Sequence, residues 1–166
     1  PYFNQHKQWK MIIAPHVISE DHLSQIMKLL TGRNVVRYTQ ATPETAAEAD
    51  VMIIDCFGLL SSIYRYGQVA YVGGGFGAGI HNTLEAAVWG VPVFFGPNNQ
   101  KFKEAQGLKA CGGGLEINNA ADFQTRMDTI AETIAKGDAV GKEAAGYVTS
   151  HAGATDKVLK ACLGQG

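Results

Sequence analysis

Cysteine, long apolar runs and an excess of either charge are scarce or missing in this sequence of 166 residues. Its three cysteines (Cys56, Cys111 and Cys162) share no short spacing, which argues against a disulfide scaffold or a zinc site and for a reducing compartment. No stretch approaches the roughly 18 consecutive apolar residues that would predict a membrane span. Basic and acidic residues, 14 and 15 in number, leave a net charge of −1, so a nucleic-acid-binding groove is not expected.

Two familiar phosphate-binding motifs are also missing. The pattern G-x-x-x-x-G-K-[ST] occurs nowhere, which excludes a P-loop. Residues 73–78 formally satisfy the dinucleotide pattern G-x-G-x-x-A, but they follow the fourth predicted strand rather than the first, and no acidic residue ends the next strand. A Rossmann dehydrogenase is therefore not expected. The histidines show no metal-like spacing, so we predict neither a cofactor nor a metal ion.

What the sequence does contain is the pattern of an α/β protein. Apolar residues make up 46% and charged residues 17%, as in soluble globular proteins. Short apolar strands are predicted over residues 11–15, 35–38, 51–54, 69–72, 91–95 and 115–117. Helices are predicted over residues 20–31, 59–66, 83–89, 102–110, 121–136, 139–151 and 155–163. This alternation predicts a single domain, residues 1–166, with a Rossmann-like open parallel sheet, helices on both faces and a helical C-terminal tail.

The loops after the first, third, fourth and fifth strands should share one edge of this sheet, where open α/β sheets bind their ligands. Glycine is concentrated in one of these loops, residues 73–79. A tight turn requires only one or two glycines, whereas a run of them lets backbone N–H groups approach a phosphate or a carboxylate. We therefore predict that this loop binds an anionic ligand.

Three polar residues, His81, Asn82 and Glu85, stand at the start of the short helix that follows the glycines. Two interpretations of Asn82 and Glu85 remain open, and they are not exclusive. The two residues have the spacing of a capping box. Alternatively, the Glu85 carboxylate accepts two ribose hydroxyls, while His81 and the helix amides face an anion.

A second histidine, His16, follows Pro15 at the end of the first strand and so belongs to the same predicted edge. A lone histidine is often a satisfied polar residue, but His16 and His81 at neighbouring strand ends can face one anionic group. Cys56, Ser61 and Ser62 lack a local base and are interpreted as non-catalytic.

Together, these segments resemble the signature of the 3-deoxy-D-manno-octulosonic acid (Kdo) transferases, which reads approximately F-V-G-G-S/T, G-G-H-N-x-L-E-x, G-x-P-V and G-P. The matching stretches here are YVGGG at 71–75, GIHNTLEAA at 79–87, GVPV at 90–93 and GP at 96–97. DCFGLL at 55–60, with Tyr64, resembles the family's D-x-x-G-x-L segment, and APH at 14–16 its P-R-H or A-P-H element. The resemblance runs from about Met11 to Glu116. Pro15 stands where many members have Arg, and Ile80 replaces a second glycine.

The resemblance implies a two-domain GT-B glycosyltransferase, of which this chain is the C-terminal, nucleotide-sugar-binding half and hence a fragment of a longer protein. That family transfers Kdo, with inversion and without a metal, from CMP-Kdo to a lipid A precursor at the cytoplasmic face of the bacterial inner membrane. Its catalytic base and its membrane- and acceptor-binding surfaces belong to the N-terminal domain. We therefore expect this fragment to be soluble, to have no catalytic residue and to be inactive alone.

By the same resemblance, Glu85 would hold the ribose, the glycine loop with His16, His81 and Asn82 would contact the CMP phosphate region, and Phe57 with Gly58 would border the base. The substrate-binding residues implied in this way are His16, Phe57, Gly58, Gly73, Gly74, Gly75, Gly79, His81, Asn82 and Glu85.

Two alternatives are the donor domain of another GT-B enzyme that uses a UDP- or GDP-sugar, and a non-catalytic nucleotide-binding module. Many UDP-sugar enzymes of this fold place a second acid upstream of the ribose-binding Glu, at the position that Gly77 occupies here, and this difference favours CMP.

Overall fold

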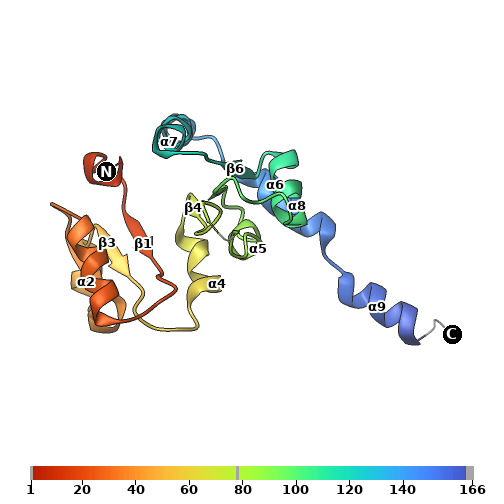
Figure 1. Cartoon of the computed structure of the whole chain (residues 1–166), viewed down its shortest axis with the longest axis horizontal. Coiled ribbons are helices and arrows are strands. Elements are labelled where there is room, and N and C mark those ends of the chain that lie inside the picture. Colours follow the sequence, from red (N-terminus) through yellow and green to blue (C-terminus); the bar gives the residue numbers. More distant parts are fainter. Residues whose placement is uncertain (1, 78, 164–166) are drawn as a thin grey trace. The chain divides into compact units, whose positions relative to one another are not determined.

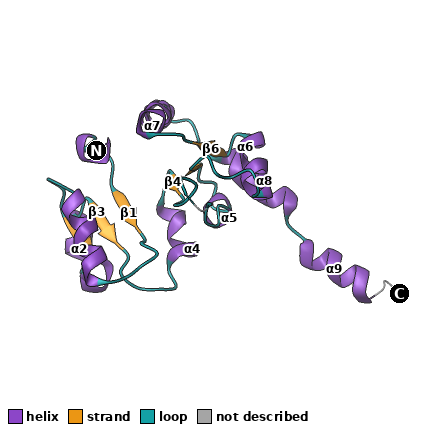
Figure 2. Ribbon diagram, in the orientation of Figure 1, coloured by secondary structure: helices purple, strands orange, loops and turns teal. Residues whose placement is uncertain are grey.

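The computed structural model describes residues 2–77 and 79–163, which form two compact units, Pro1–Ser62 and Ile63–Gly166. Each unit has its own three-stranded, all-parallel sheet with helices beside it (Figures 1 and 2). The predicted α/β class, the six strands and the helical C-terminal segment are confirmed. Among the helices of the described part, none is both long enough and apolar enough to cross a membrane.

In the first unit, the central strand of the sheet is β3, with β1 and β2 on either side. Its buried residues Val51 and Ile53 pack with Leu23 of the neighbouring helix α2 to form the core of the unit. Because the strands are parallel, the loops after β1 and β3 leave the sheet at the same edge. The elements are α1 (Tyr2–Gln5), β1 (Met11–Ile13), α2 (Glu20–Leu29), β2 (Val35–Arg37), the 3-10 helix η1 (Tyr38–Gln40), α3 (Pro43–Glu48), β3 (Val51–Ile53) and α4 (Leu60–Ile63), which crosses into the second unit.

Two helices of this unit begin at side-chain caps. The Ser19 hydroxyl accepts the N–H of His22 and so caps α2. Thr42 and Thr45 form a reciprocal capping box at the start of α3, whose first residue is Pro43. Each cap satisfies N–H groups that have no partner within their own helix.

In the second unit, the central strand of the sheet is β5, between β4 and β6. Its fully buried side chains alternate between the two faces: Val93 and Phe95 join one core cluster with α5, α6 and α8, whereas Phe94 packs edge-on against Phe123 of α7 at 5.2 Å. Helices thus cover both faces of this sheet. The elements are η2 (Tyr64–Tyr66), β4 (Ala70–Tyr71), α5 (Leu84–Ala87), β5 (Val93–Phe95), α6 (Lys103–Cys111), β6 (Gly114–Glu116), α7 (Ala120–Ala135), α8 (Lys142–His151) and α9 (Ala154–Leu163).

Candidate functional site

The glycine loop, residues 73–79, leaves the carboxyl end of β4 and closes on itself. Gly74 and Ile80 form an isolated antiparallel bridge, and the N–H of Gly75 donates to the carbonyl of Gly79 at 2.6 Å. Gly74, Gly75 and Gly79 have φ angles of 89°, 82° and 129°, which residues with a side chain rarely adopt. Glycine is therefore required at these three positions by the backbone itself.

The loop after β5 packs directly against the glycine loop. A Cβ atom at Gly75 would lie 2.7 Å from the Cα of Gly96, so the two backbones touch. Asn98 joins them further: its N–H donates to the carbonyl of Gly75 at 2.8 Å, and its side-chain amide donates to the carbonyl of Gly77 at 2.9 Å. Gly77 itself has no such steric requirement, because a Cβ there would meet no described atom within 4 Å.

His81, Asn82 and Glu85 follow the loop in a tight arrangement around the start of α5. The N–H of His81 donates to the carbonyl of Gly73 at 3.2 Å, which brings the histidine beside the first glycine. The Asn82 amide donates to Glu85 Oε1 at 3.0 Å, and its carbonyl oxygen accepts the N–H of Leu84 at 3.0 Å. His81 and Asn82 are exposed and Glu85 is half-buried.

This geometry differs from a capping box. In such a box the carboxylate would accept the backbone N–H of the capping residue, whereas Glu85 accepts the side-chain amide of Asn82. The helix is also shorter than predicted: α5 covers only Leu84–Ala87. Asn82 therefore orients the Glu85 carboxylate, and this carboxylate satisfies no backbone N–H group that the structure records.

A hollow of about 280 Å³ opens beside these residues. Ile80, Leu84 and Phe102 give it an apolar wall, and the polar atoms come from His81, Asn82, Thr83 and Glu104. Burial, together with the negative charge of Glu85, raises the pKa of the nearby Tyr64. The hollow therefore offers the His81 imidazole, the Asn82 amide and the Glu104 carboxylate, and Asn82 also binds the Glu85 carboxylate.

The remaining predicted site residues lie in the first unit, at the edge where β1 and β3 end. His16 follows β1 and is exposed. Phe57 follows β3, and 83% of its surface is exposed. Gly58 has a φ angle of 89°. The parallel pairing of Ile13 with Ile53 brings the two loops to the same edge, as predicted.

Asp55, between β3 and Phe57, is a buried anchor. Its carboxylate accepts the N–H of Thr39 at 2.9 Å, the Thr39 hydroxyl at 2.6 Å and the Arg37 guanidinium at 2.8 Å. Burial by itself raises the pKa of Asp55, but the hydrogen bonds from Thr39 and Arg37 outweigh it and lower the pKa to about 2. A carboxylate held in this way is a poor general base at neutral pH.

Three further residues near the glycine loop were not predicted from the sequence as site residues. Phe102 and Glu104 line the hollow, and Asn99 lies in the loop after β5 with its side chain completely buried. Phe102 and Glu104 belong to a helix that the pattern predicted without assigning it a role. Asn99 follows a Gly-Pro pair and reads as an ordinary turn residue.

No family model matches the chain, but curated proteins do. The 3-deoxy-D-manno-octulosonic acid transferase of Aquifex aeolicus is 39% identical over 82 residues, which are 48% of this chain and 23% of that protein. The enzyme of the same name from Bordetella pertussis is 32% identical over 135 residues, 78% of this chain and 31% of that protein. The chain thus spans between 23% and 31% of the length of these relatives.

A solved structure is also similar: the C-terminal CMP-Kdo binding domain of WaaA from Acinetobacter baumannii. The match has a TM-score of 0.69 and 25% sequence identity, and it covers 89% of this chain and 78% of that one. Sequence and fold therefore agree on one assignment. The chain belongs to the 3-deoxy-D-manno-octulosonic acid transferase family and corresponds to its C-terminal domain.

Proposed function

We propose that residues 1–166 bind the nucleotide sugar CMP-Kdo and that the glycine loop and the start of α5 hold its nucleotide. The observation that carries this proposal is the arrangement at the start of α5. His81 and Asn82 line the hollow, Asn82 binds the Glu85 carboxylate, and the preceding loop has exposed backbone at Gly74 and Gly77. The solved relative, which is described as a CMP-Kdo binding domain, supports the same ligand.

The chemistry divides between backbone and side chains. Backbone N–H groups of the glycine loop and the His81 imidazole face the phosphate. The dipole of α5 adds little to this binding, because the helix has only four residues. The bond from Asn82 fixes one oxygen of the Glu85 carboxylate and so orients the other toward the ribose hydroxyls. His16, Phe57 and Gly58 stand at strand ends of the first unit, and the roles that the family resemblance implies for them stay predictions.

For the whole protein, we propose that Kdo is transferred from CMP-Kdo to a lipid A precursor at the cytoplasmic face of the bacterial inner membrane. The names of the relatives support the transferase activity, and their greater length leaves room for a second domain. Transfer to a hydroxyl requires a general base. The low pKa of Asp55 argues against this residue, and the family resemblance implies that the base belongs to the N-terminal domain.

Titration of the 166-residue chain with CMP, UMP and GMP, by calorimetry or NMR, tests the donor assignment. We expect weak binding of CMP and a clear preference for CMP over UMP and GMP. Equal binding of the three nucleotides would favour another GT-B donor domain. Absence of binding to any of them would contradict the nucleotide site itself.

A further inference from the structure

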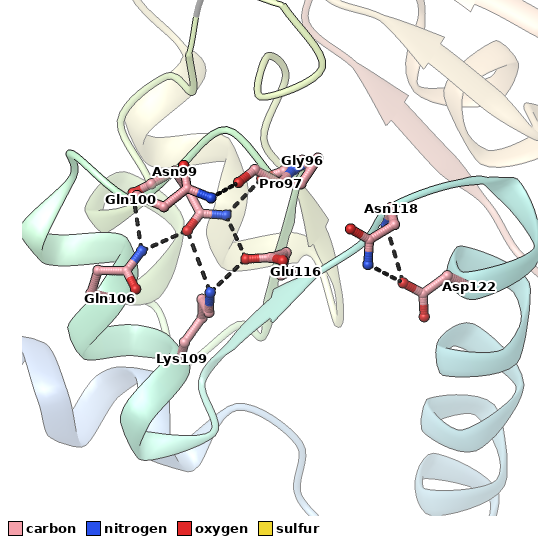
Figure 3. A network of polar contacts seen from close by, with 9 residues as sticks. All are labelled: Gly96, Pro97, Asn99, Gln100, Gln106, Lys109, Glu116, Asn118 and Asp122. Carbon is pink, nitrogen blue, oxygen red and sulfur yellow. Dashed lines mark hydrogen bonds and ion pairs between the residues drawn. The ribbon is translucent and has the colours of Figure 1, made fainter.

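The glycine loop packs against the loop after β5, and that second loop is itself held by hydrogen bonds to β6 and α6. Asn99 lies in it with no exposed surface. Its side-chain amide donates to the carbonyl of Gly96 and to Glu116 Oε2, both at 2.8 Å. Its side-chain oxygen accepts the amide of Gln106 at 2.6 Å (Figure 3). Both donor hydrogens and the acceptor of this buried side chain are thus satisfied, as a buried polar group requires.

The partners of Asn99 come from two further elements of the second unit. Glu116 ends β6, while Gln106 and Lys109 lie on α6, and Lys109 Nζ pairs with Glu116 Oε2 at 2.5 Å (Figure 3). Hydrogen bonds from Lys109 and Asn99 lower the pKa of Glu116, so the carboxylate is charged when it accepts them. The network therefore joins α6 and β6 to the carbonyl of Gly96.

Gly96 is the point at which this network meets the glycine loop. A Cβ at Gly96 would lie 2.5 Å from the carbonyl carbon of Gly75, so the two backbones pack closely and Gly96 cannot move toward Gly75 without displacing it. The next residues transmit the same constraint, because Asn98 donates to the carbonyls of Gly75 and Gly77. The contact is backbone against backbone and leaves no flexible side chain to absorb a shift.

We propose that Asn99 is a positioning residue for nucleotide binding: by donating to the carbonyl of Gly96, it sets the position of the glycine-loop amides that receive the phosphate. This inference rests on the function proposed above. Within the network, the roles differ. The Lys109–Glu116 ion pair stabilises the fold, whereas the bond from Asn99 to Gly96 fixes the loop.

Two variants separate these roles. The double variant Asn99→Asp, Glu116→Gln exchanges the amide and the carboxylate between the two positions. One carboxylate stays beside Lys109, and positions 99 and 116 keep one donor and one acceptor for each other. Position 99, however, no longer donates to the carbonyl of Gly96. Lys109→Met removes the ion pair and the longer contact of Lys109 Nζ with Asn99 Oδ1 at 3.5 Å, but it keeps the donor to Gly96 and the closer bond from Gln106 to Asn99 Oδ1 at 2.6 Å. We expect the double variant to bind CMP about tenfold more weakly, the effect of one lost hydrogen bond of about 1.4 kcal/mol. We expect Lys109→Met to lower the melting temperature and to leave CMP affinity unchanged.

Asn118→Asp is the matched control. Asn118 also donates to a carboxylate, that of Asp122 at 3.2 Å, but this pair stands at the start of α7 and has no recorded bond to the loop after β5 (Figure 3). CMP affinity should not change in this variant. Unchanged affinity in the double variant would overturn the proposal. A tenfold loss of affinity in Lys109→Met would also overturn it, because CMP affinity would then only follow the stability of the fold.

NMR of the ligand-free protein supplies a readout that does not depend on nucleotide binding. The amide resonances of Gly73, Gly75 and Gly77 should shift in the double variant and stay in place in Lys109→Met. If the wild-type chain binds no nucleotide and these resonances still shift in the double variant, the positioning of the loop stands and the proposed function fails. If they do not shift, the positioning proposal fails by itself.

Discussion

At the scale of single residues, Glu85 is the side chain that most directly separates a ligand contact from a structural one. Glu85→Ala should weaken CMP binding by about 1.5–3 kcal/mol, the range for hydrogen bonds to a charged group. The melting temperature should change little, because the recorded partner of Glu85 is the side chain of Asn82 rather than a backbone N–H. Calorimetry and thermal unfolding of the same variant measure both quantities.

Glu143→Ala provides the control for this comparison. Glu143 is the second residue of α8, as Glu85 is the second residue of α5, so the two substitutions remove the same charge from the same helix position. Only Glu85→Ala should affect CMP binding. A lower melting temperature with intact affinity in Glu85→Ala would assign Glu85 to the helix and remove it from the ribose site.

The glycines of the loop offer a second test at this scale. Gly75→Ala should lower the free energy of unfolding by more than about 1 kcal/mol, because the residue has a positive φ angle and the added Cβ would collide with Gly96. Gly77→Ala meets open space and should change it by no more than about 0.5 kcal/mol. Chemical denaturation of both variants measures the difference, and equal losses would contradict the loop geometry described above.

At the scale of secondary-structure elements, Asp55 ties the end of β3 to β2 and η1 through Arg37 and Thr39. Its pKa of about 2 lies below the ordinary value of 3.8, so the unfolded chain binds this proton more readily than the folded chain does. The stability that Asp55 contributes is therefore present above pH 3.8 and is lost as the pH falls toward about 2.

This linkage predicts how Asp55→Asn behaves across a pH series of denaturation measurements. The variant should be clearly less stable than wild type at neutral pH, and the difference should shrink as the pH is lowered from 3.8 toward about 2. Asp21→Asn, which removes an exposed carboxylate of α2, should have the smaller effect at neutral pH. A difference for Asp55→Asn that does not depend on pH would show that its charge does not stabilise the folded state.

Most elements could be predicted because their signals are local. The strands are short apolar runs, and α2 begins at Glu20, as predicted, directly after the capping residue Ser19. The predicted helix over residues 83–89 is the main difference. Only Leu84–Ala87 is α-helical. After it, the N–H groups of Trp89 and Gly90 donate to the carbonyls of Ala86 and Ala87, three residues earlier, which makes a tighter turn than an α-helix. Gly90, with a φ angle of 70°, ends it.

The site could be predicted only where it is local in sequence. His81, Asn82 and Glu85 lie within five residues of one another, so their motif already indicates that they act together. The contact of Gly75 with Gly96 and the bond from Asn99 to Glu116 join segments far apart in the chain. No periodicity or spacing encodes such contacts, and Asn99 could therefore be identified only from the fold.

At the scale of the whole molecule, we predict that residues 1–166 alone transfer no Kdo, even with saturating CMP-Kdo and acceptor. The reason is chemical: Asp55 is held as a low-pKa anion, and the other polar groups of the candidate site are assigned to the donor. A transfer assay of this chain, beside the full-length protein, measures the difference. Turnover by the 166-residue chain that His16→Ala or Asp55→Asn abolishes would place the base here.

The network below the glycine loop also bears on the order in which the protein matures. A ribosome delivers the chain from its N-terminus, and residues 73–79 emerge well before Lys109 and Glu116. Until β6 has left the ribosome, Asn99 lacks its carboxylate partner, and the network below the loop is incomplete. If Asn99 positions the loop as proposed, a nascent chain can contain every residue of the nucleotide signature and still bind a nucleotide more weakly than the finished protein does, until Glu116 has left the ribosome and paired with Asn99.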